Sequence, residues 1–163
     1  MTHSDTLPAL ISSRICHDLA SPLMAIANGL ELLEMSGFGG TPEAELLSDS
    51  VKSARARMEF FRIAFGSAAS EGQIGPRRAQ EALGDHFRDR KIVVRWDVTD
   101  NVSRADAKSA FLLAQCCETA MPRGGTITLS RDGGAWVLIA ETPTVRDVPD
   151  LWCHIPEGSM AVS

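Results

Sequence analysis

The chain has 163 residues, 44% of them hydrophobic, and a net charge of −5. This length fits one compact domain or two small ones, and the negative charge offers no basic field for nucleic acid. No apolar run approaches the roughly 20 residues that span a bilayer, and residues 1–9 lack the core of a signal peptide. We therefore expect a cytoplasmic protein that binds neither nucleic acid nor membrane, with its four cysteines reduced.

The first predicted element is a long helix over residues 7–35. At about 100° per residue, one face of this helix collects seven apolar residues: Ile11, Ile15, Leu19, Pro22, Ile26, Leu30 and Leu33. His17 lies roughly 180° from the centre of that face, so we expect its ring to be exposed. Residues 36–40 (SGFGG) end the helix and form a loop.

A second helix is predicted to begin with Thr41 as N-cap, Pro42 at the first helical position and Glu43 in the first turn. Apolar residues then recur at heptad spacing: Leu47, Val51, Ala54, Met58, Phe61 and Phe65. A single antiparallel hairpin cannot bury two apolar faces of this length, whereas two hairpins make a four-helix bundle. The pattern therefore predicts a homodimer.

Residues 67–75 are small and polar, which predicts a linker between a helical domain, residues 1–66, and a second domain, residues 76–163. The second domain is predicted to contain a helix over 76–89, a strand over 91–98, a helix from Ser103 to about Met121, and strands over 126–131 and 135–141. Asp132, Gly133 and Gly134 join the last two strands as a hairpin turn. This order indicates a small α/β sandwich, so the whole chain is expected to be α+β. Such a sandwich should continue after Ile139, so the tail is either shortened or truncated.

The strongest chemical signal is residues 14–23 (RICHDLASPL), which place His17 and Asp18 on the first helix and Pro22 five residues after the histidine. A proline in a helix interior costs about 3 kcal/mol and leaves the carbonyl of Asp18 without its helical donor. The chain thus sets a kink beside a titratable histidine. The pattern His-acidic-x-x-x-Pro-Leu resembles the phospho-acceptor box of two-component signalling.

A phospho-acceptor histidine must be exposed, and its attacking nitrogen must be neutral. Asp18 is a candidate to take the ring proton or to fix the tautomer. Arg14 and Ser21 lie on the same helix face as His17. Both are candidates to contact phosphoryl oxygens.

The exposed face around His17 carries small or thin side chains, which lets a partner domain press against the helix. These candidate docking residues are Ser13, Ala20, Met24 and Asn28. A further candidate is Phe60, which lies with Ala56 and Ile63 roughly opposite the heptad stripe. This group either packs on the second domain or another bundle helix, or docks a receiver domain. No cluster of acids lies near His17, so the Mg2+ that phosphoryl transfer usually needs would come from the partner.

Residues 1–66 resemble the dimerisation and phosphotransfer domain of sensor histidine kinases. Residues 13–22, with the later segment 62–66 (RIAFG), resemble more closely the ChpT-type histidine phosphotransferases of alphaproteobacterial relays. The resemblance covers nearly the whole chain. It implies a homodimeric protein-histidine phosphotransferase whose histidine takes phosphate from the receiver domain of a hybrid kinase and passes it to the receivers of response regulators.

In sensor kinases, a domain with the order of residues 76–163 binds ATP. Here the helix that should bear the metal-binding asparagine reads LLAQCCETA over residues 112–120, and Glu141-Thr142-Pro143 replaces Asp-x-Gly. Proline lacks both the backbone freedom of glycine and an N–H group. We therefore expect a degenerate ATPase-like domain with no bound cofactor or metal. The alternatives are an ATP-dependent kinase fragment and a non-catalytic dimeric adaptor.

Overall fold

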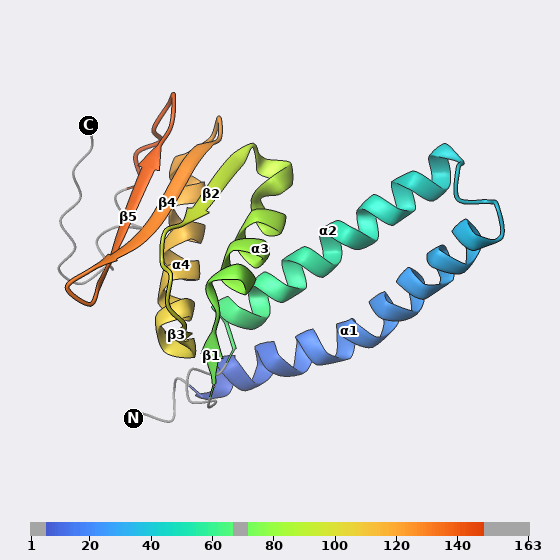
Figure 1. Ribbon diagram of the computed structural model, residues 1–163, viewed down its shortest axis with the longest axis horizontal. Coiled ribbons are helices and arrows are strands. Elements are labelled where there is room, and N and C mark those ends of the chain that lie inside the picture. Colours follow the sequence, from blue (N-terminus) through green and yellow to red (C-terminus); the bar gives the residue numbers. More distant parts are fainter. Residues whose placement is uncertain (1–5, 67–71, 149–163) are drawn as a thin grey trace.

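The computed structural model describes residues 6–66 and 72–148, without the side chains of residues 6–10 and Ser13. Helices α1 (Thr6–Met35) and α2 (Pro42–Ala64) form the predicted antiparallel hairpin (Figure 1). The start of α2 is as predicted, because the backbone N–H of Ala44 donates to Thr41 Oγ1 at 3.2 Å and Pro42 occupies the first helical position.

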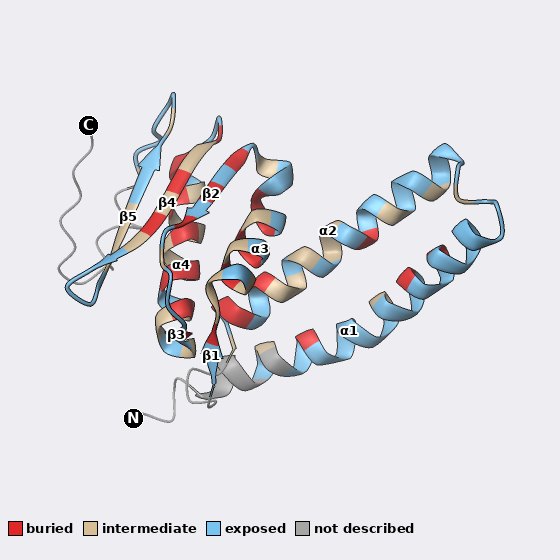
Figure 2. Cartoon of the chain, in the orientation of Figure 1, coloured by how far each residue is buried: buried red, intermediate tan, exposed pale blue. Residues whose placement is uncertain are grey.

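The two helices of the hairpin contact each other through only part of the predicted apolar surface. Cys16, Ala27 and Leu30 of α1 and Val51 of α2 are buried. Most of the predicted α1 face stays about half exposed, namely Ile11, Ile15, Leu19, Ile26 and Leu33. Figure 2 shows the resulting contrast between a largely exposed hairpin and a buried core in the other half of the chain.

The second half is an α/β sandwich built in the predicted order. Helix α3 (Pro76–Phe87) continues into a 3-10 turn, η1 (Arg88–Arg90), and helix α4 (Arg104–Ala120) follows later. Strands β2 (Ile92–Trp96), β4 (Gly125–Asp132) and β5 (Ala135–Glu141) form one sheet in the order β2-β4-β5. Strand β2 runs parallel to β4, and β4 runs antiparallel to β5. The buried side chains of β2 and β4 pack with α3 and α4 in one core.

The predicted linker over residues 67–75 is wrong at its C-terminal end. Gln73–Ile74 forms a short strand, β1, that pairs antiparallel with β3 (Val102–Ser103), and Ile74 is fully buried. A two-residue strand has no periodicity of its own, so its existence depends on the partner strand. Residues 67–71 of the predicted linker, and residues 149–163 of the predicted second domain, lie outside the described residues.

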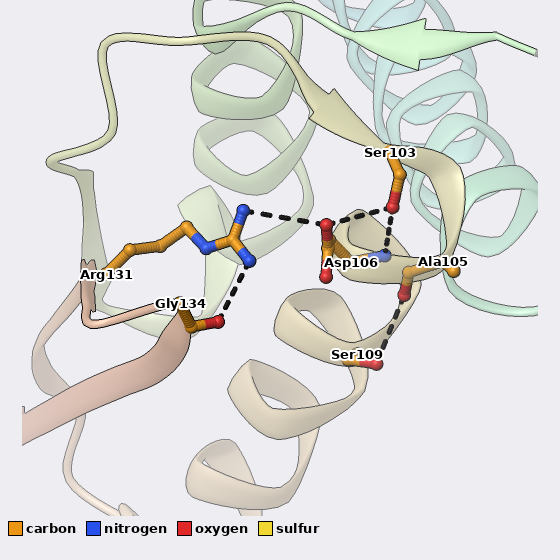
Figure 3. A network of polar contacts seen from close by, with 6 residues as sticks. All are labelled: Ser103, Ala105, Asp106, Ser109, Arg131 and Gly134. Carbon is orange, nitrogen blue, oxygen red and sulfur yellow. Dashed lines mark hydrogen bonds and ion pairs between the residues drawn. The ribbon is translucent and has the colours of Figure 1, made fainter.

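The β4–β5 hairpin is tied to the first turn of α4 by a polar network (Figure 3). Arg131 Nη2 donates to the carbonyl of Gly134 at 2.9 Å, and Arg131 Nη1 lies 3.5 Å from Asp106 Oδ2. Ser103 is the N-cap of α4, since its hydroxyl oxygen accepts from the backbone N–H of Asp106 at 3.0 Å. Gly133 and Gly134 both have positive φ, 55° and 89°, which a two-residue hairpin turn requires.

The C-terminal end of α2 enters the core of the sandwich, which corrects the expectation that Phe60 docks a partner. Phe60 is fully buried, so this side chain is not available for docking a partner. Its ring stacks on His86 with centroids 3.8 Å apart and lies 5.2 Å from the ring of Phe111. His86 is itself only 3% exposed. The imidazole of His86 is therefore packed among the aromatic rings of this core.

Candidate functional site

His17 lies in the middle of α1, five residues before the helix passes through Pro22. As predicted, the ring is exposed: 83% of the side-chain surface is open to solvent. The reason is geometric, because Cys16, Ala27 and Leu30 face α2 while His17 points about 100° away from Cys16 round the helix.

The carboxylate of Asp18 links His17 to Arg14. Asp18 Oδ1 lies 3.3 Å from His17 Nδ1, and Asp18 Oδ2 accepts from Arg14 Nε at 2.8 Å. In the tautomer with the proton on Nδ1, the carboxylate accepts that proton's hydrogen bond and leaves the Nε2 lone pair free. The arrangement therefore suits Asp18 for orienting the ring. Arg14 is engaged by Asp18, but an exposed pair of this kind is worth about 1 kcal/mol or less and can rearrange.

The other predicted site residues lie along the exposed side of α1. Ser21, one turn after His17, is exposed, as is Pro22. Ala20, Met24 and Asn28 are also exposed, and their small or thin side chains leave room for a partner on this side of α1. The position of Ser13 is on α1, but its side chain is outside what the structure describes. The structure thus brings together the predicted residues of α1 and separates Phe60 from them.

A cleft of about 920 Å3 opens beside His17, and we call it the histidine cleft. Its walls are α1, α2 and the α3–η1 segment. The α1 wall consists of Cys16, His17, Ala20, Leu23 and Met24, and the opposite wall includes Arg78, Glu81, Ala82, Asp85, Arg88 and Asp89. Burial raises the pKa of the Cys16 thiol, although the charge of Arg62 opposes this. Next to His17, the thiol therefore stays protonated.

Sequence reasoning missed the charged wall of the histidine cleft. Glu59 of α2 lies between two arginines, Arg62 on the same helix and Arg78 on α3. The first pair is a local i, i+3 contact that sequence spacing could have suggested. The pair with Arg78 joins residues 19 positions apart, and it exists only because α3 docks against α2.

Residues of the two segments that depart from the nucleotide motifs of sensor kinases make contacts within the sandwich. On α4, Gln115 Nε2 donates to Glu118, which also pairs with Arg90. After β5, Thr142 Oγ1 donates to the carbonyl of Gly124 at 2.8 Å.

Over residues 6–66 and 72–148, no three His, Cys, Asp or Glu side chains gather as a metal site. None of the helices in these ranges is long and apolar enough to cross a membrane.

Comparison with known proteins places this geometry in a family. Residues 76–160 match the model of the histidine phosphotransferase C-terminal domain. The chain is 42% identical over 130 residues to protein phosphotransferase ChpT of Brucella abortus (strain 2308). The aligned region covers 78% of this chain and 61% of the relative. The chain thus spans about three fifths of the length of that curated relative.

A solved 1.7 Å structure of a bacterial phosphotransferase is 35% identical to this chain, with a TM-score of 0.58. The similarity covers 91% of this chain and 73% of the other. It extends over both the helical hairpin and the α/β sandwich, which agrees with the predicted α+β fold. With more than half of its residues matched by the family model, the chain belongs to the histidine phosphotransferase family.

Proposed function

We propose that this protein is a phosphoryl shuttle in a two-component phosphorelay. His17 accepts a phosphoryl group from the aspartate of a receiver domain on a hybrid histidine kinase and passes it to the receivers of response regulators. The observation that carries the proposal is the exposed ring of His17, held through Nδ1 by Asp18 at the edge of the histidine cleft. Family membership supports the same activity.

The transfer from aspartate to histidine needs only the two proteins and the metal ion of the donor. The Nε2 lone pair of neutral His17 forms a bond to phosphorus while the bond from phosphorus to the aspartyl oxygen breaks, and the donor aspartate leaves as a carboxylate. The ring now carries positive charge with its proton on Nδ1, where Asp18 stabilises it. The second transfer reverses these bond changes onto a new aspartate.

The partners in this proposal are receiver domains, in the cytoplasm, that supply Mg2+ themselves. The small or thin side chains of Ala20, Met24 and Asn28 would let a receiver approach α1 closely and bring its aspartate to His17. The chain would bind no cofactor of its own, and neither nucleic acid nor membrane would be a partner.

A homodimer is part of the proposal. The apolar stripe of α1 is about half exposed, and Leu47, Phe61 and Phe65 of α2 are exposed as well, so one chain leaves these apolar side chains uncovered. A groove of about 600 Å3 between the helices, which includes Leu19, Leu46 and Met58, adds to it. A second copy of the hairpin has the matching apolar faces to make a four-helix bundle.

The test is incubation with a receiver domain phosphorylated on its aspartate. Radiolabel should appear on the wild-type protein and be absent from the His17→Gln variant, which removes the nucleophile. Radiolabelled ATP is the parallel arm: autophosphorylation at His17 would show a kinase fragment and overturn the shuttle. A His17→Ala variant that still relays phosphate between two receivers would favour an adaptor.

A further inference from the structure

Within the described residues, α2 is the hairpin helix that packs into the sandwich core. Phe60, Ile63 and Ala64, in the last turns of α2, are buried in the core that includes α3 and α4. Among the described side chains, this core contains no residue of α1. The position of α3 relative to the helix that carries His17 is therefore set by how α2 holds α3. Apolar burial is strong but non-directional, so it holds α2 and α3 together without defining the angle between them.

A directional contact lies beside this anchor, on the side that faces the histidine cleft. Glu59, which directly precedes Phe60, accepts on Oε1 from Arg78 Nη2 at 2.8 Å and from Arg78 Nε at 3.1 Å. Its second oxygen, Oε2, lies 2.6 Å from Arg62 Nη2. Both carboxylate oxygens are thus used, and all three side chains line the histidine cleft together with His17.

The environment of Glu59 makes this bridge stronger than an ordinary surface pair. The Glu59 side chain is only 30% exposed, which weakens screening by water. Burial would raise the pKa of this carboxyl, but the hydrogen bonds and charges of Arg78 and Arg62 outweigh burial and lower the pKa. Glu59 therefore stays ionised, and a guanidinium that donates through two nitrogens restricts the angle between α2 and α3.

We propose that Glu59 is a positioning residue for phosphoryl transfer: its bridge to Arg78 holds the α3 wall of the histidine cleft at a fixed angle to His17. A partner domain then meets both walls in one orientation, with its aspartate in line with the imidazole. This inference rests on the proposed shuttle function and extends it to a residue that does not touch the phosphoryl group. Loss of a fixed orientation of this kind slows a transfer because reacting atoms must meet within a fraction of an ångström.

The test compares two donors for each variant. A phosphorylated receiver needs the cleft walls, whereas a small phosphoramidate salt reaches the exposed His17 without them. In Glu59→Gln, we expect kcat/KM for the receiver to fall roughly tenfold or more, while labelling by phosphoramidate stays at the wild-type rate. Arg78→Gln, which leaves Glu59 paired with Arg62, should show the same split. The double variant should be no slower than the single ones, because all three disrupt the same ion pair between Glu59 and Arg78.

The matched control is Asp106→Asn. Like Glu59→Gln, this variant replaces by an amide the carboxylate of a partly exposed ion pair with an arginine of another element, here Arg131. This ion pair joins α4 to the β4–β5 hairpin and does not line the histidine cleft (Figure 3). We expect wild-type rates with both donors for this control. Thermal unfolding of every variant, followed by circular dichroism, shows whether the fold is retained.

Three outcomes would overturn the inference: an unchanged receiver rate in both Glu59→Gln and Arg78→Gln, an equal loss with both donors, or an equal loss in Asp106→Asn. The last two would mean that the bridge serves stability alone. A wild-type protein that takes phosphate from phosphoramidate but not from any receiver would instead refute the shuttle function, and the inference with it.

Discussion

Two histidines of this chain have opposite environments, and the difference decides what each can do. His17 is exposed and next to a carboxylate, so the proposed phosphoryl donor can reach its ring. His86 is buried against Phe60, and burial, followed by the positive charge of Arg90, lowers its pKa from 6.5 to about 4. Only one of the two rings is therefore available for chemistry, while the other is part of the core.

The low pKa of His86 predicts acid sensitivity. The unfolded chain, with an ordinary histidine pKa of 6.5, takes up the proton before the folded chain does as the pH falls. The free energy of unfolding should therefore decrease by up to about 1.4 kcal/mol per pH unit between pH 6.5 and 4, with no contribution from His86 above that window. Urea unfolding across this range measures the slope. In His86→Phe, which keeps a stacked ring without titration, the slope should be smaller, and an equal slope would contradict the assignment.

Asp18 is expected to affect the rate of transfer more than the fold. In Asp18→Asn the amide cannot stabilise the positive charge that His17 gains, so transfer from a phosphorylated receiver should slow by about 10²-fold. Arg14→Gln removes the ion pair with Asp18 but leaves the carboxylate, and a smaller loss is expected. Rapid-quench measurement of label on His17 would check both variants. A rate for Asp18→Asn equal to that of wild type would rule out its role.

At the scale of elements, two adjacent phenylalanines of α2 belong to different surfaces. Phe60 is fully buried in the sandwich core, whereas Phe61 is 39% exposed on the predicted bundle seam. We expect Phe60→Ala to lower the free energy of unfolding by about 3–5 kcal/mol because it opens a cavity among aromatic rings. Phe61→Ala should cost clearly less within one chain and act mainly on self-association. Urea unfolding at low protein concentration separates the two, and equal losses would contradict this division.

The sequence was sufficient for the order and type of most elements because their signals are local. Thr41 and Ser103 cap helices, and Gly133-Gly134 turns a hairpin, through contacts with residues only a few positions away. The acceptor box is likewise contained in one stretch of α1. Periodicity shows which residues share a helix face, but it does not show which surface covers that face. For this reason the sequence left open whether Phe60 packs on the second domain or docks a partner, and it gave no sign of the bridge from Glu59 to Arg78.

At the scale of the whole molecule, the hairpin projects away from the sandwich with most of its apolar stripe uncovered (Figures 1 and 2). A protein that forms the proposed bundle should sediment at twice 17.6 kDa. Ile26→Glu places a charge on the stripe at a side chain that is 51% exposed, so it should disrupt the dimer and leave the hairpin intact. Analytical ultracentrifugation checks the mass and circular dichroism checks the helices. A wild-type protein that sediments as a monomer at micromolar concentration would contradict the dimer.

The exposure of His17 also has a kinetic consequence. No wall of the histidine cleft covers the ring, so a phosphoryl group on Nε2 would meet every receiver that diffuses past. All receivers would then exchange phosphoryl groups with the same pool of phosphohistidine. The net direction of phosphoryl transfer would depend on the relative concentrations and phosphorylation states of these receivers. A change in the abundance of one receiver would thereby alter the phosphorylation of all the others, without any change in this protein.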